Sequence, residues 1–120
     1  MKKFAFSRRS RLRLKKDFEA VFDGGKKAAT RELVIWHAPG EKGDKKLGLM
    51  VSKKIGGAVK RNRLKRLLRE AFRLSSYELK EGTRLIVYPK AGCAVNSVTQ
   101  ARAALDNALR RAGLKNNDGK

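Results

Sequence analysis

Apolar residues recur at helical spacing in three parts of the chain. Near the N-terminus Leu14, Phe18, Val21 and Phe22 follow the spacing i, i+4, i+7, i+8, and the stripe stops at the glycine pair 24–25. Such a stripe is typical of a short amphipathic helix, and glycine readily takes the left-handed conformation that ends one. The pattern predicts a helix from about Leu14 to these glycines.

Two longer helices are predicted further along. The first, within residues 60–73, carries the apolar stripe Leu64, Leu67, Leu68, Ala71 and Phe72. The second, within residues 96–114, carries the stripe Val98, Ala101, Leu105, Ala108, Leu109 and Ala112. Asn96 or Ser97 can cap the start of the second helix, and Gly113 followed by Leu114 suits a Schellman end.

In three other segments the residues follow the period-of-two pattern of a β-strand, in which successive side chains face opposite sides: "RELVIWH", "KLGLMVSK" and "TRLIVYPK". The turn-rich stretch "APGEKGDK" separates the first two, which predicts that they pair as an antiparallel hairpin. Residues 26–30 are a candidate for a short preceding strand.

The predicted elements give the order αβββαβα, with no internal repeat and no second core. This order favours a single α+β domain built as a two-layer α/β sandwich. A chain of 120 residues is long enough to bury one core without disulfides or metals. We assign residues 14–114 to this domain, residues 1–13 to a basic N-terminal arm and residues 115–120 to a flexible tail.

The charge balance narrows the class of partner. Thirty-one Lys and Arg against 11 Asp and Glu give a formal net charge of +20, and self-repulsion of that size favours a polyanionic partner such as nucleic acid. Residues 53–73 alone contain nine bases and one acid, Glu70. On the helix predicted there, Asn62, Arg66, Arg69 and Arg73 lie opposite the apolar stripe, with Arg63 and Lys65 beside them and Arg61 toward the first turn. A merely solvated helix face is the alternative, but such faces usually mix signs.

Side chains suited to catalysis are scarce. His37 is the only histidine and Cys93 the only cysteine, which together cannot close a zinc site, and the acids are scattered along the chain. We therefore expect no catalytic residues and no metal ligands in this chain. One cysteine and no apolar signal segment favour the cytoplasm.

The aromatic residues allow two interpretations. Phe18, Phe22, Trp36 and Tyr88 suit a core on base rates. Beside Ser52, Lys53 and Lys54 they would instead offer stacking faces next to cations, an arrangement suited to a single-stranded nucleic acid.

The segments "KRNRLKRLLREAFR", "GLMVSKKIGGAV" and "RLKKDFEAVFDGG" resemble the protein component of bacterial ribonuclease P, and the resemblance runs from about Leu12 to Leu114. It implies an unusual left-handed βαβ crossover. It also implies a subunit of a ribonucleoprotein whose RNA removes the 5′ leader of precursor tRNA, with Mg²⁺ bound mainly by the RNA and none bound tightly by the protein alone.

The resemblance also implies two sets of binding residues. For the catalytic RNA they are Arg61, Asn62, Arg63, Lys65, Arg66 and Arg69. For the leader of precursor tRNA they are Phe18, Phe22, Trp36, Ser52, Lys53 and Lys54. The expected partners are thus the catalytic RNA and precursor tRNA, with no membrane and no obligate protein partner. A ribosomal protein of similar fold and a nuclease acting without RNA are the competing hypotheses.

Overall fold

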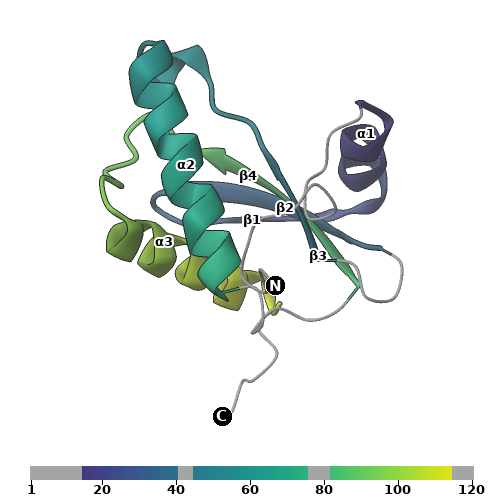
Figure 1. Ribbon diagram of the computed structural model, residues 1–120. Helices are drawn as coiled ribbons and strands as arrows, with labels where there is room; N and C mark the ends of the chain where they lie inside the picture. Colours follow the sequence, from purple (N-terminus) through teal and green to yellow (C-terminus); the bar gives the residue numbers. More distant parts are fainter. Residues whose placement is uncertain (1–14, 41–44, 76–81, 115–120) are drawn as a thin grey trace, which may run out of the picture.

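A computed structural model describes residues 15–40, 45–75 and 82–114 (Figure 1). The basic arm predicted at residues 1–13 and the tail predicted at residues 115–120 lie outside the described residues. None of the helices in the described ranges is both long enough and apolar enough to cross a membrane.

Within residues 15–40, 45–75 and 82–114, three α-helices and four strands follow the predicted order. They are α1 (Lys15–Gly24), β1 (Lys26–Ala29), β2 (Leu33–Pro39), β3 (Lys45–Leu49), α2 (Ala58–Ser75), β4 (Thr83–Pro89) and α3 (Val98–Ala112), with a short 3₁₀ helix η2 (Lys53–Ile55) before α2. The order αβββαβα is confirmed, and so is the short strand predicted before β2.

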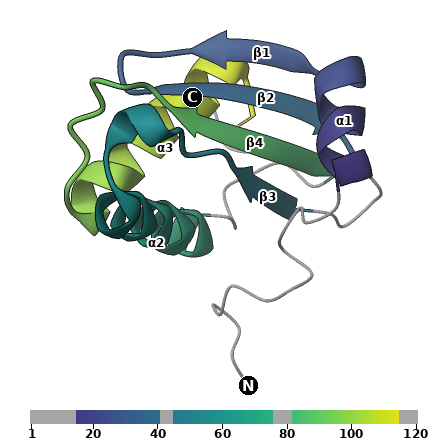
Figure 2. The same cartoon turned by 90° about the horizontal axis from the view of Figure 1, so that it is seen from above.

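The strands form one sheet in the order β1-β2-β4-β3. Helices α2 and α3 cover one face of this sheet, while α1 lies on the other face at one end (Figures 1 and 2). The larger core lies under α2 and α3 and includes Leu33, Leu68, Leu85 and Leu105, each exposed by 1% or less. The smaller core lies under α1 around Val21, Ala38 and Ile86. Among the helices of the described ranges, only α1 lies on this second face, at one end of it.

The ends of α3 match the sequence prediction. Ser97 is the N-cap, and its Oγ accepts a hydrogen bond from the Gln100 N–H at 3.1 Å. Gly113 is left-handed with φ 74°, and its N–H and that of Leu114 donate to the carbonyls of Arg110 and Leu109. These two bonds form the predicted Schellman motif.

The predicted hairpin between "RELVIWH" (residues 31–37) and "KLGLMVSK" (residues 46–53) is wrong. Strand β2 pairs antiparallel with β1 and β4, and β3 pairs parallel with β4 on its far side. The physical reason lies in β4, where the consecutive residues Leu85, Ile86 and Val87 are all buried. A strand that is apolar on both faces belongs in the middle of a sheet, so β4 inserts between β2 and β3.

Because β3 and β4 are parallel neighbours, the chain has to cross the sheet between them. It does so through η2 and α2, which lie between the two strands in sequence. Figures 1 and 2 show α2 on the same side of the sheet as α3. This β3-α2-β4 unit is the βαβ crossover for which the resemblance implies the uncommon left hand.

Candidate nucleic-acid interface

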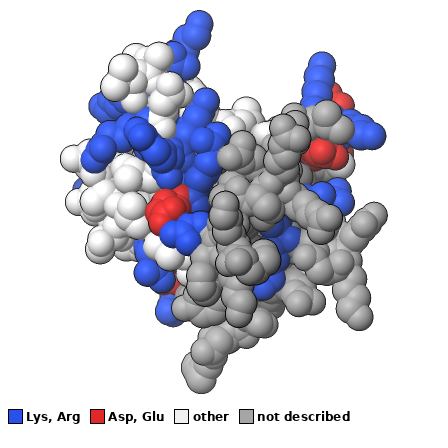
Figure 3. Space-filling model, viewed as in Figure 1, with Lys and Arg blue, Asp and Glu red and all other residues white. Residues whose placement is uncertain are grey.

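Helix α2 has one apolar side and one cationic side. Leu64, Leu68, Ala71 and Phe72 are each no more than 5% exposed and pack into the larger core. Arg66 lies opposite them on the helix and is exposed, as are Asn62 and Arg63. We call the predicted set Arg61, Asn62, Arg63, Lys65, Arg66 and Arg69 the cationic face of α2. Figure 3 shows Lys and Arg side chains gathered over this helix.

Two arginines of the cationic face are held by uncharged acceptors. Arg61 Nε donates to the carbonyl oxygen of Gly56 at 3.1 Å. Gly56 has φ 149°, a conformation that favours glycine, and a Cβ at this position would collide with the side chain of Lys60. Arg63 Nε and Nη2 donate to Oδ1 and the carbonyl oxygen of Asn96, at 3.3 and 2.9 Å. Both guanidinium groups therefore keep their full charge.

The C-terminal half of α2 is less cationic than the sequence alone predicts. Arg73, expected on the exposed cationic side, forms an ion pair and two hydrogen bonds with Glu70. The hydrogen bond from Arg73 is the main cause that lowers the pKa of the Glu70 carboxyl below its ordinary value. Lys65 and Arg69 are half-buried. The exposed positive charge of α2 is thus concentrated toward its first turns.

The aromatic residues form a row on the sheet face beside α1. Phe22 of α1 meets Trp36 of β2 edge to face, with ring centroids 5.1 Å apart. Trp36 in turn meets Tyr88 of β4 at 6.3 Å. Phe18 is half-buried and packs against the smaller core. We call Phe18, Phe22, Trp36 and Tyr88 the aromatic surface; it is partly exposed, so these residues are not the fully buried core that base rates favour.

Ser52, Lys53 and Lys54 lie between the end of β3 and the start of α2. Ser52 caps η2 by accepting a hydrogen bond from the Lys54 N–H at 3.0 Å, and both lysines are exposed. Gly48 of β3 pairs with Ile86 of β4, which packs under α1 on the face of the aromatic surface. The 52–54 segment therefore connects the sheet that carries the aromatic surface with the helix that carries the cationic face.

Two residues outside the leader-binding set that the resemblance implies, Tyr88 and Lys27, lie beside that set. Tyr88 contacts Trp36, and Lys27 of β1 places its Nζ 5.6 Å from the centroid of the Trp36 ring, within range of a cation–π interaction. Alternation along "TRLIVYP" puts Tyr88 on the same face as Ile86, a signal that was available from the sequence. Lys27 could not be found that way, because its position depends on the pairing of β1 with β2.

His37 and Cys93 do not form a catalytic pair. His37 pairs with Leu85 near the start of β4, whereas Cys93 follows the end of that strand. Burial, with the nearby charge of Lys26, lowers the pKa of His37, and burial also raises the pKa of the half-buried Cys93 thiol. Within the described ranges, no three His, Cys, Asp or Glu side chains gather into a group that could hold a metal ion.

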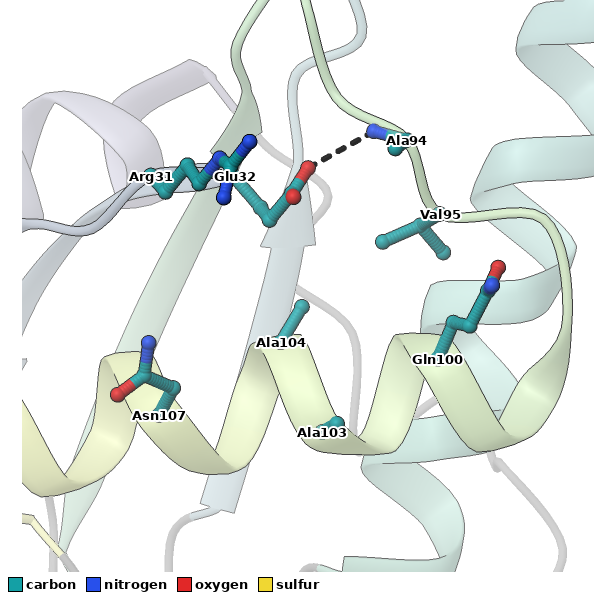
Figure 4. Close-up of a pocket in the computed structure, with 8 residues that line it drawn as sticks. All are labelled: Arg31, Glu32, Ala94, Val95, Gln100, Ala103, Ala104 and Asn107. Atoms are coloured by element: carbon teal, nitrogen blue, oxygen red, sulfur yellow. Dashed lines mark hydrogen bonds between the residues drawn. The ribbon is translucent and has the colours of Figure 1, made fainter.

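Two cavities lie away from both predicted sets of binding residues. One, of about 330 Å³, lies between residues 31–32, residues 94–95 and one flank of α3 (Figure 4). The other, of about 370 Å³, lies between β1, β2, β4 and Leu114. The cationic face of α2 and the aromatic surface are open surfaces, which suits an extended polyanion better than a small molecule.

Fold and surface together define a class: a small, strongly basic α+β protein with a cationic helix and an open aromatic sheet face. Comparison with known proteins narrows this class to one family. The family model described as Ribonuclease P matches residues 6–113.

Curated relatives agree with the family model. The "Ribonuclease P protein component" of Clostridium perfringens (strain SM101 / Type A) is 36% identical over 114 residues, covering 89% of this chain and 91% of the relative. The protein of the same name from Bacillus cereus (strain B4264) is 33% identical over 109 residues, covering 90% of this chain and 95% of the relative.

Solved structures agree in fold. The RNase P protein from Thermotoga maritima matches with a TM-score of 0.77 and 32% identity, covering 86% of this chain and 97% of that one. The Staphylococcus aureus RNase P protein matches with a TM-score of 0.79 and 28% identity, covering 89% and 98%. The chain belongs to the ribonuclease P protein family, and the predicted resemblance is confirmed.

Proposed function

We infer that this chain is the protein subunit of a ribonuclease P ribonucleoprotein, in which RNA performs the Mg²⁺-dependent endonucleolytic removal of the 5′ leader from precursor tRNA. The chain would bind the catalytic RNA and the leader and would supply no catalytic side chain. Its partners would be the catalytic RNA and precursor tRNA. The protein would be located in the cytoplasm.

The observation that carries this proposal is the exposed cationic face of α2, whose first arginines are held by uncharged acceptors. Arginine grips a phosphate with two parallel hydrogen bonds, and each neutralised phosphate releases counterions, which favours binding. Arg61, Asn62, Arg63, Lys65, Arg66 and Arg69 would contact the catalytic RNA. A carboxylate partner cancels such a charge, as Glu70 does for Arg73, whereas Arg61 and Arg63 donate to uncharged oxygens.

The leader would lie on the aromatic surface. Phe18, Phe22 and Trp36 offer ring faces and edges for base stacking, and Ser52, Lys53 and Lys54 offer polar and charged groups at the junction with α2. Tyr88 and Lys27 extend this proposed site. Because residues 52–54 connect the two surfaces, one protein could hold catalytic RNA and leader side by side.

The described residues do not fit a magnesium site, because their carboxylates do not gather into a group. We propose that the RNA subunit binds the Mg²⁺. The contribution of the protein would be electrostatic: a chain of net charge +20 screens the repulsion between ribozyme and substrate, so that less Mg²⁺ is needed for the two to associate.

Reconstitution tests this function. Cleavage of precursor tRNA by the catalytic RNA is measured at low Mg²⁺ with and without the protein, and we expect substantial cleavage only with the protein. Equal cleavage in both reactions would refute an assisting role. Cleavage by RNA-free protein would establish the nuclease hypothesis instead.

A further inference from the structure

Arg63 on α2 is joined to a residue 33 positions later in the chain. Its Nε and Nη2 groups donate to Oδ1 and to the carbonyl oxygen of Asn96, at 3.3 and 2.9 Å, and both residues are exposed. A guanidinium has five N–H donors, so the two N–H groups of Nη1 and the second N–H of Nη2 are not used by this contact. The contact fixes the side chain and leaves donors for a phosphate.

Asn96 differs in charge from the partners of Arg73 and Arg110. Arg73 is paired with Glu70 and Arg110 with Asp106, and each of those carboxylates cancels a positive charge. Asn96 is neutral, so it orients Arg63 without cancelling its charge. Exposed hydrogen bonds of this kind contribute little to folding stability, because water competes for the same groups.

Asn96 is itself held in place by its neighbours. Its N–H donates to Oε1 of Gln100 at 2.7 Å, while the Gln100 N–H donates to Oγ of the N-cap Ser97. Two residues before Asn96, the Ala94 N–H donates to Oε1 of Glu32 at 2.8 Å, a bond shown in Figure 4. The Glu32 carbonyl also accepts from the Lys90 N–H. The loop between β4 and α3 is therefore fastened on both sides of the point where it meets Arg63.

We propose that Asn96, in the loop just before α3, is a positioning residue for RNA binding. It holds the Arg63 guanidinium in a fixed orientation before RNA arrives. A long side chain that is already ordered loses less conformational entropy on binding, so the complex is tighter. The inference rests on the proposed function, because it requires that Arg63 binds the catalytic RNA.

Single variants separate positioning from folding. We expect Asn96→Ala to weaken binding to the catalytic RNA about 2- to 10-fold, the cost of ordering one long side chain, with an unchanged thermal unfolding midpoint. Asn107→Ala, which removes an exposed amide on α3 itself, is the matched control and should bind as the wild type does. Asn96→Asp should hold Arg63 but cancel its charge, which lowers the slope of log affinity against log salt by about 0.7 to 0.9.

A double-mutant cycle tests whether Asn96 affects RNA binding through Arg63. With Arg63 replaced by alanine, the further change Asn96→Ala should cost nothing, because the group that it positions is gone. Equal losses from Asn96→Ala in both backgrounds would overturn the inference and make Asn96 an independent contact. If the wild type binds the RNA tightly and neither Asn96→Ala nor Arg63→Ala lowers that affinity, the inference is overturned as well. A wild type that fails to bind the RNA would refute the proposed function itself.

Discussion

The ring of Trp36 on β2 meets the ring of Phe22 on α1 edge to face, with centroids 5.1 Å apart and planes at 83°. Phe22 is 37% exposed, although it packs against another aromatic ring. The contact joins the helix to the open sheet face, and Tyr88 continues the row on β4. An aromatic row that stays partly exposed can accept an unpaired base.

Phe22→Ala tests this surface. We expect the variant to bind leader-bearing precursor tRNA more weakly by about 1 to 3 kcal/mol, the value of one base–aromatic stack. Binding of mature tRNA, which lacks the leader, should not change. Phe22 suits the test better than Phe18, because Phe18 packs against the buried cluster and its removal would also affect folding. An equal loss for both substrates would argue against a leader site.

Arg66→Ala tests the cationic face of α2. Arg66 is exposed and lies opposite the buried side of the helix, so its loss should lower the salt slope of RNA binding by about 0.7 to 0.9. Arg110→Ala is the matched control, since Arg110 is exposed on α3 but paired with Asp106. Affinities measured over a salt series give both slopes. Equal effects of the two variants would mean that net charge, and not its position, governs binding.

Glu70→Gln should strengthen RNA binding. The change removes the only acid within residues 53–73 and the carboxylate that pairs with Arg73. We expect higher affinity at low salt and a steeper salt slope, with a small loss of stability because partly exposed ion pairs contribute little. The affinity of the variant for the catalytic RNA measures the gain. Weaker binding would show that Glu70 holds Arg73 in the orientation that RNA needs.

The pKa of His37 predicts a pH-dependent stability. Burial, and then the charge of Lys26, lowers this pKa below its ordinary 6.5, so the folded protein binds the proton more weakly than the unfolded chain does. Above about pH 6.5 the titration of His37 therefore does not change the free energy of unfolding. Below that pH the free energy of unfolding falls as the pH drops toward the pKa of His37 in the folded protein. The urea midpoint should be lower at pH 5.5 than at pH 7.5.

The variant His37→Gln tests whether His37 causes this pH dependence of stability. His37 is the only histidine, and histidine is the side chain that ordinarily titrates in this range. The difference between the two urea midpoints should shrink in the variant. A difference of unchanged size would assign the titration to another group.

Local chemistry was predictable from the sequence, and strand pairing was not. The stripe of α2 and the caps of α3 at Ser97 and Gly113 depend on residues within one or two turns, so the sequence predicts them directly. Pairing joins residues far apart, as β3 with β4. The turn-rich stretch after β2 is compatible with either a hairpin or a longer excursion, and only the doubly apolar pattern of β4 decides between them.

The candidate site, too, was predictable from the sequence only in part. The cationic face of α2 follows from helical spacing, but the partners that set its charge do not. Glu70 lies three residues from Arg73, so that pair could have been anticipated. Asn96 meets Arg63 only because α3 packs against α2, a contact that spacing within one helix cannot reveal. Tertiary packing therefore determines the partner of Arg63, which the spacing of residues along α2 does not.

Lysine footprinting tests the central claim most directly, by measuring how fast each lysine is acetylated in the free protein and in its RNA complexes. Catalytic RNA alone should protect Lys60 and Lys65 on α2, and adding precursor tRNA should then protect Lys27, Lys53 and Lys54. If Lys60 and Lys65 react in the complex as fast as in the free protein while lysines elsewhere are protected, the RNA does not bind α2 and the account is contradicted.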